Sequence, residues 1–170
     1  MRAQIDAMAV ALPEVAGHPN RRGFRGTLTV ANEPSEQAPS GARGHRVMLT
    51  AKATERALPS LLGMAVDYAP KLDRHDARQK VGIITAAEMR ARGAGQSVEV
   101  EGYLFAHDFP EVIEEMRRRR GELGMSYEIA DVRVLDAEAP VWVATEFTFT
   151  GAAMLLREKA AYQGTNVELV

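Results

Sequence analysis

Serine and histidine are the residue types through which this chain could carry out nucleophilic chemistry. The chain has five serines, four histidines and no cysteine. A thiolate nucleophile, a disulfide and a thiolate metal site are therefore excluded. An unassisted serine hydroxyl is a weak nucleophile, and a histidine must take its proton. The pair to look for is a serine on a rigid element and a histidine that can reach it.

Ser126 is the serine with the most rigid expected support. It lies in GELGMSYEI, where Gly121 and Gly124 release the chain from a predicted helix and lead it into a predicted strand. Glycine beside a serine also permits close approach of a substrate backbone. From this pattern alone, Ser126 can equally be a structural polar residue at a strand edge. The other serines lie in a predicted loop, in a leucine-rich turn or at the start of a strand: Ser35, Ser40, Ser60 and Ser97.

His75 is the histidine that directly precedes a predicted buried strand. It lies in KLDRHDARQK, a charged segment followed by the apolar run VGII. Sequence spacing does not show that His75 reaches Ser126, so an exposed loop residue remains the alternative.

A metal site is the second chemistry that the histidines allow. His-Asp occurs twice, at His75-Asp76 and at His107-Asp108, and a metal phosphohydrolase would need several such ligands to converge. Asp108 is expected instead to cap the following helix, and the other two histidines lack metal-ligand spacing. We therefore expect no metal and no other cofactor, with a metal hydrolase as the alternative.

The segments expected to position these residues are mostly strands. Alternating or apolar runs predict strands over 24–30, 46–51, 97–106, 125–136 and 141–151, and at the start of 80–91. Helices are predicted over 54–63, from Thr54 as N-cap to Gly63, over 108–121, with Asp108 as N-cap, and over 152–163. These elements indicate a β-rich α+β fold, a closed or nearly closed β-barrel of mostly antiparallel strands with a few surrounding helices.

Length and composition favour a single domain. The 170 residues suit one hydrophobic core, which we expect over 23–170, behind a flexible N-terminal arm of residues 1–22. A mobile loop is expected at about 32–44, where Pro, Ser and Gly concentrate. No segment approaches the ~20 apolar residues of a membrane span, and the N-terminus does not have the pattern of a signal peptide.

The charge pattern gives no reason to expect a nucleic-acid partner. The net charge is −2, and the basic run 117–120 ends a predicted helix whose acids come first, an order that complements the helix dipole. Pairs at i,i+4 are expected between Glu114 and Arg118 and between Glu115 and Arg119. We therefore expect neither a nucleic-acid nor a membrane partner.

Four segments, in this order along the chain, resemble the tailed-phage prohead (capsid maturation) proteases, serine peptidases of herpesvirus-assemblin-like fold. HDARQKVG resembles that family's histidine segment, and SVEVEGYLF resembles the next strand. GELGMSYEI resembles the serine segment, and ATEFTFTGAA resembles a later strand that ends in a turn. The resemblance covers about residues 45–155, and the chain has TGAA where the family has a proline-containing turn.

The resemblance implies a serine endopeptidase in which His75 is the general base and Ser126 the nucleophile. The family's third catalytic residue is an acid on the strand after the serine, where Glu146 is the nearest candidate. Glu128, two residues past Ser126, and Asp76 are the fallback candidates for orienting the histidine.

The resemblance also implies where the oxyanion and the partners of the reaction would be found. Backbone near Gly124, helped by Arg133, would stabilise the oxyanion or contact the substrate. The expected activity is cleavage of major capsid protein and scaffold (delta-domain) segments, with the chain itself as a further candidate substrate, inside the assembling procapsid in the bacterial cytoplasm. Self-association as a homodimer or larger assembly is expected. The alternative is a non-catalytic capsid-assembly or scaffold-associated protein that keeps the protease fold.

Overall fold

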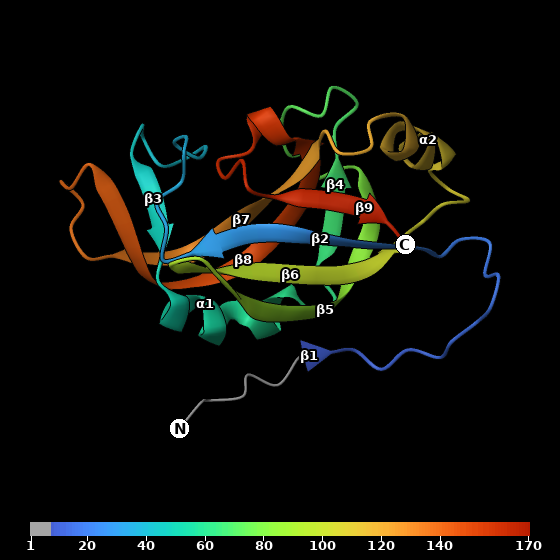
Figure 1. Ribbon diagram of the computed structural model, residues 1–170, viewed down its shortest axis with the longest axis horizontal. Coiled ribbons are helices and arrows are strands. Elements are labelled where there is room, and N and C mark those ends of the chain that lie inside the picture. The colour runs from blue at the N-terminus through green and yellow to red at the C-terminus, as the bar shows by residue number, and fades with distance from the viewer. Residues whose placement is uncertain (1–7) are drawn as a thin grey trace.

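The computed structural model describes residues 8–170, and most of the chain forms strands (Figure 1). Residues 1–7 of the predicted arm lie outside the described part. The elements in chain order are β1 Met8–Ala9, β2 Arg22–Ala31, β3 Arg46–Leu49, α1 Ala51–Ala57, the 3₁₀ turn η1 Leu58–Leu61, β4 Ala65–Tyr68, β5 Lys80–Arg92, β6 Gly95–Leu104, α2 Pro110–Arg118, β7 Leu123–Val134, β8 Val141–Leu156, the 3₁₀ turn η2 Arg157–Lys159 and β9 Asn166–Leu169.

All nine strands belong to one sheet, whose main path runs β3-β8-β4-β5-β6-β2-β9. β7 pairs with β8 and packs against β2, so the sheet curls round through a ring of six strands. The pairing is mostly antiparallel, as expected, with β3 and β4 parallel to β8. The fold is therefore a β-rich α+β fold, as predicted.

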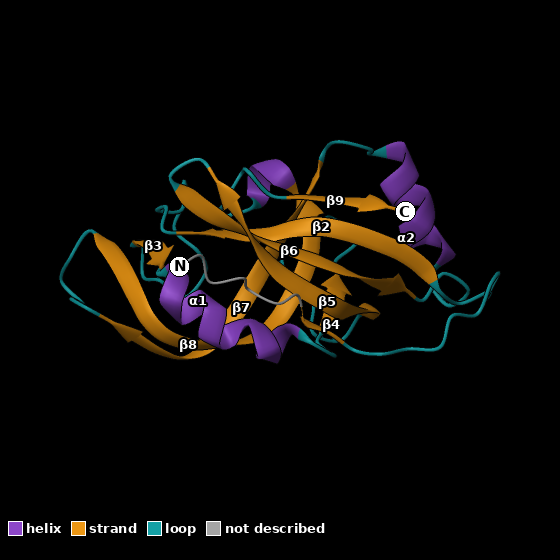
Figure 2. Cartoon of the chain, turned by 60° about the horizontal axis from the view of Figure 1, so that its bottom comes forward, coloured by secondary structure: helices purple, strands orange, loops and turns teal. Residues whose placement is uncertain are grey.

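The helices lie outside this curled sheet and away from one another (Figures 1 and 2). α1 packs against β8, and α2 lies near the end of β9. In α2, Glu115 pairs with Arg119 as predicted, but Arg118 pairs with Glu115 at i,i+3 instead of Glu114. Neither helix of the described chain is long and apolar enough to cross a membrane.

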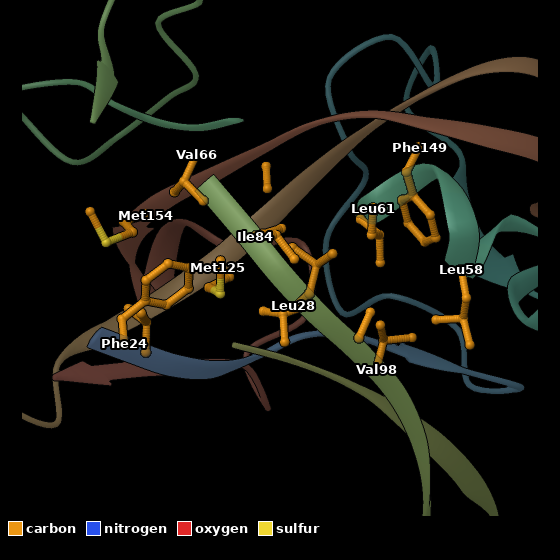
Figure 3. Close-up of a cluster of buried hydrophobic side chains, with 14 of the residues drawn as sticks. Phe24, Leu28, Leu58, Leu61, Val66, Ile84, Val98, Met125, Phe149 and Met154 are labelled. Carbon is orange, nitrogen blue, oxygen red and sulfur yellow. The ribbon is translucent and has the colours of Figure 1, made fainter. Parts of the chain in front are cut away.

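The core fills the inside of the curled sheet (Figure 3). In β2, Phe24 and Leu28 are buried in this core, as the pattern of FRGTLTV predicts, although a register shift between Thr27 and Thr29 interrupts the alternation and residues 26–31 are all buried. Their neighbours in the main cluster come from β5 and β7 and include Ile84 and Met125. Because β7 contributes to this cluster, the strand that carries Ser126 is fixed from its inner face.

The prediction of a helix over 152–163 is wrong. Residues Ala152–Leu155 continue β8, which pairs with β7 along one edge and with β4 along the other. These residues are buried on both faces, and an apolar run buried on both faces has no alternation to distinguish it from a helix. Only η2 follows, at Arg157–Lys159.

The bounds of the other two helices also differ from the prediction. The first helix begins at Ala51, where Thr50, not Thr54, caps it by accepting from the Ala53 N–H. Asp108 does not cap α2, because the N-cap residue is Phe109, without a side-chain cap hydrogen bond; the Asp108 carboxylate accepts from the Asn20 side-chain amide at 2.8 Å. Gly121 follows α2 with a φ of 84°, the left-handed conformation expected where a helix stops.

The loop over 32–44 has no regular secondary structure, as predicted, but parts of it are tied to the sheet. Ser35 is buried, and its hydroxyl accepts from the Val47 N–H at 3.0 Å. The arm is held at β1, which pairs with β5, and at Asn20, whose side-chain oxygen accepts from the His107 N–H at 2.8 Å.

Candidate active site

Ser126 lies near the start of β7, on a rigid three-strand surface. Met125 and Tyr127, the residues on either side, belong to or pack against the main core, so alternation turns Ser126 to the opposite face. The chain enters this strand directly after the left-handed turn at Gly121. The expected rigid support for Ser126 is therefore present.

The strand register places one residue from each of β4, β8 and β7 side by side in a row. Asp67 in β4 and Ser126 in β7 are both paired with Ala153 in β8. Residues in such register project from the same face of the sheet, and two strand spacings separate Asp67 from Ser126 by about 10 Å. The small Ala153 side chain between them leaves space above the row.

His75 bridges this row from the loop between β4 and β5. Its Nε2 lies 3.1 Å from Ser126 Oγ, and its Nδ1 lies 3.1 Å from Asp67 Oδ2. A histidine 51 residues before Ser126 in the chain is thus within hydrogen-bond reach of its hydroxyl. The three side chains form a continuous Asp67–His75–Ser126 relay.

The hydrogen-bond chemistry of this relay assigns the proton on the imidazole. A carboxylate accepts and does not donate, so Nδ1–H donates to Asp67 and Nε2 keeps its lone pair. The lone pair can accept the Ser126 O–H. This is the arrangement in which a histidine removes a proton from a serine that attacks a carbonyl.

Asp67 is fixed more firmly than a surface acid would be. It is fully buried, and its Oδ1 accepts from the Asp76 N–H at 2.9 Å while Oδ2 accepts from His75. Lys80 Nζ lies 3.6 Å from the same Oδ2 and supplies a positive charge to the buried carboxylate. Asp67 therefore holds both the His75 side chain and the backbone that follows it.

The loop that carries His75 is anchored by Leu72. This leucine is buried, with a φ of 53°, a left-handed conformation that costs a residue with a Cβ roughly 1–3 kcal/mol. The Leu156 N–H at the end of β8 donates to the Leu72 carbonyl at 2.8 Å. The His75 loop is thus tied to the strand that pairs with Ser126.

The structure does not place Glu146, the predicted third catalytic residue, beside His75. Glu146 is exposed and pairs with Arg133 at 3.0 Å, seven residues along β8 from Ala153. That separation places it roughly 20 Å from the relay. Asp76 contributes its backbone N–H, while its carboxylate pairs with Arg78, which lowers the Asp76 pKa.

Glu128, the other fallback candidate, does lie at the site. Its Oε1 is 3.6 Å from His75 Nδ1, farther than the Asp67 oxygen. Glu128 is a neighbour of the relay. The contact with His75 Nδ1 that was expected of an acid on the strand after the serine is made by Asp67 of β4, which precedes the serine in the chain.

Of the two candidates for oxyanion stabilisation, Arg133 lies away from the relay, and Gly124 lies in β7 two residues before Ser126. Arg133 is exposed and occupied by Glu146. Gly124 is buried against η2, where a Cβ would come 2.6 Å from Thr165 Oγ1 and 3.1 Å from Arg157 Cα. Its lack of a side chain allows the C-terminal segment to pack on β7, which is a structural role.

Asp67 is the site residue that the sequence did not predict. It lies in MAVDYA, a short apolar stretch after Gly63 in which no element is predicted. The signal in the sequence was a single acid in an apolar run, because burial of such an acid requires a partner.

The remaining histidines and serines lie outside this site. Among residues 8–170, no group of three or more His, Asp and Glu side chains could hold a metal ion. His107 is exposed beside Asp108. The Ser60 hydroxyl donates to Ala57 and accepts from Phe149, an internal structural role.

No protein-family model, curated protein or solved structure matches this chain.

Proposed function

We propose that this protein is a serine endopeptidase in which Ser126 is the nucleophile, His75 the general base and Asp67 the residue that positions His75. The observation that carries the proposal is the Asp67–His75–Ser126 relay, with both of its hydrogen bonds at 3.1 Å. A buried acid, a bridging imidazole and a half-buried hydroxyl on a rigid strand are the parts that acyl transfer requires.

The proposed reaction has two halves. Ser126 Oγ attacks the scissile carbonyl carbon as its proton passes to His75 Nε2, and Asp67 stabilises the resulting imidazolium. The C–N bond then breaks, and His75 returns the proton to the leaving amine, which leaves an acyl group on Ser126. A water attacks this ester with His75 again as base, and the second product leaves as a carboxylic acid.

The proposed biological role is capsid maturation in a tailed phage or prophage. The four ordered segments that resemble prohead proteases support this role, and so does the curled β-rich sheet with helices outside it, which we interpret as a closed barrel of the herpesvirus-protease type. The proposed substrates are scaffold and capsid-protein segments within the procapsid, in the cytoplasm of the bacterial host, with self-association of the protease. A non-catalytic assembly protein is less well supported, because Asp67 supplies the acid that the sequence left open.

Co-expression with the cognate major capsid protein tests this proposal. The wild-type chain and Ser40→Ala, which changes an exposed loop serine, are expected to shorten the capsid protein. Ser126→Ala and His75→Ala are expected to leave it at full length while remaining folded. Shortening by Ser126→Ala contradicts the proposal.

A further inference from the structure

Glu128 is a second acidic side chain at the site, and unlike Asp67 it lies at the surface. Its side chain is 48% exposed, whereas that of Asp67 is fully buried. It follows Ser126 by two residues in β7, so the two side chains project from the same face with their Cα atoms about 7 Å apart. An exposed carboxylate therefore stands beside the nucleophile.

The place of this carboxylate is defined by its neighbours. Glu128 lies over Gly151 in β8, where a Cβ would come 2.7 Å from Glu128 Oε2 and 3.4 Å from its Cβ. On its other side, Oε1 is 3.6 Å from His75 Nδ1. The absence of a side chain at Gly151 thus makes room for Glu128 next to the reacting atoms.

Orientation of His75 does not explain why an acid stands here. Asp67 already accepts from Nδ1 at 3.1 Å and is buried, and a buried, fully bonded acid orients an imidazole better than an exposed one. Glu128 therefore has a charge that the relay does not need.

The negative charge of the Glu128 carboxylate is largely uncompensated by cations of the described chain. Within residues 8–170, no lysine or arginine nitrogen lies within 4.0 Å of the Glu128 carboxylate, and His75 is its only basic neighbour at that range. On the His75 loop, Lys80 pairs with Asp67 and Arg78 with Asp76, and neither Lys71 nor Arg74 lies within 4.0 Å of the Glu128 carboxylate.

We propose that Glu128 determines substrate specificity by favouring a lysine or arginine within two residues of the scissile bond. This inference rests on the proposed peptidase function. A peptide whose carbonyl carbon lies at Ser126 Oγ brings its flanking side chains within reach of a residue about 7 Å away. A long basic side chain can then form an ion pair with Glu128, whereas an acidic side chain in the same place is repelled.

Mapping of cleavage sites tests the inference without knowledge of the natural substrate. The full-length chain is incubated with a denatured protein mixture of known sequences, and the new N-termini are identified by mass spectrometry. For the wild type, Lys and Arg are expected about three- to tenfold above their background frequency at one or more of the four flanking positions, as for a partly exposed ion pair. Glu128→Gln is expected to abolish this enrichment, and Glu128→Lys to replace it with enrichment of Asp and Glu.

Glu146→Lys is the matched control, because it makes the same charge change on an exposed residue roughly 20 Å away and is expected to keep the wild-type preference. A purely structural role for Glu128 would lower all cleavage without changing the ratio of basic to acidic sites. Cleavage that depends on Ser126 but has the same flanking frequencies in wild type, Glu128→Gln and Glu128→Lys overturns the inference alone. Absence of any cleavage that depends on Ser126 overturns the proposed function and the inference with it. If Glu128→Lys is inactive, Glu128→Gln, which is nearly isosteric, decides between these outcomes.

Discussion

Asp67 acts on the His75 segment through both oxygens of its carboxylate. One oxygen accepts from the imidazole and the other from the Asp76 N–H, so the acid fixes the ring and the backbone that carries it. Replacement of Asp67 by its amide tests this role at the scale of one atom.

Asp67→Asn is expected to lower kcat on the order of 10³- to 10⁴-fold, because an amide can donate to Nδ1 and stabilise the wrong tautomer. Hydrolysis of the same substrate by wild type and variant, with thermal unfolding as the test of folding, measures this effect. Glu146→Gln removes an acid that the resemblance had favoured and should leave kcat unchanged. A larger loss of kcat in Glu146→Gln than in Asp67→Asn would contradict the role of Asp67 and favour Glu146 as the third catalytic residue.

Ala153 is expected to matter because of its size. It lies between Asp67 and Ser126 in the register of three strands, under the bridging imidazole. A leucine here would occupy the space of the ring, so Ala153→Leu should reduce hydrolysis to the level of Ser126→Ala, at a stability cost of about 1–3 kcal/mol. Ala153→Gly keeps the space open and should retain hydrolysis, and full activity in Ala153→Leu would contradict this geometry.

At the scale of elements, the site depends on β7, which the sequence predicts, and on β4, which it does not predict. β7 was predicted because Ser126 follows a helix stop and begins an alternating run. β4 was missed, because four residues with one acid give too short a pattern for a strand to be recognised. Its parallel pairing with β8 is a non-local contact that no local pattern encodes.

The loop between β4 and β5 positions His75 through Leu72. Removal of the Leu72 side chain is therefore expected to lower both the stability of the fold and the reactivity of Ser126. Leu72→Ala should lower the free energy of unfolding by about 2–4 kcal/mol, as for other buried leucines. Leu58→Ala, which changes a buried leucine of η1, should cost a similar amount. Only Leu72→Ala should also speed amide hydrogen exchange over 69–79 and slow acylation of Ser126. Equal acylation rates in the two variants would show that Leu72 is structural alone.

At the scale of the whole molecule, the sequence predicted the class of fold and the proximity of His75 and Ser126 more successfully than the complete set of side chains at the site. Alternation identified strands such as β2 and β6, and the resemblance paired His75 with Ser126. Glu146 was placed wrongly because only the register of β7 on β8 shows that it lies opposite Arg133. Pairing of β4 and β7 with the two edges of β8 is what brings Asp67, His75 and Ser126 together, and the β4–β8 pairing is a long-range contact.

The most direct test of the relay is covalent labelling of the folded chain with a fluorophosphonate probe, which reacts with a serine hydroxyl only where a base has activated it. Peptide mass spectrometry is expected to find the probe on Ser126 and on no other of the five serines. Labelling should disappear in His75→Ala and in urea, where the relay is taken apart, and should persist in Ser40→Ala. An unlabelled Ser126 in the folded wild-type chain, or equal labelling in wild type and His75→Ala, would contradict the proposed activation of Ser126 by His75.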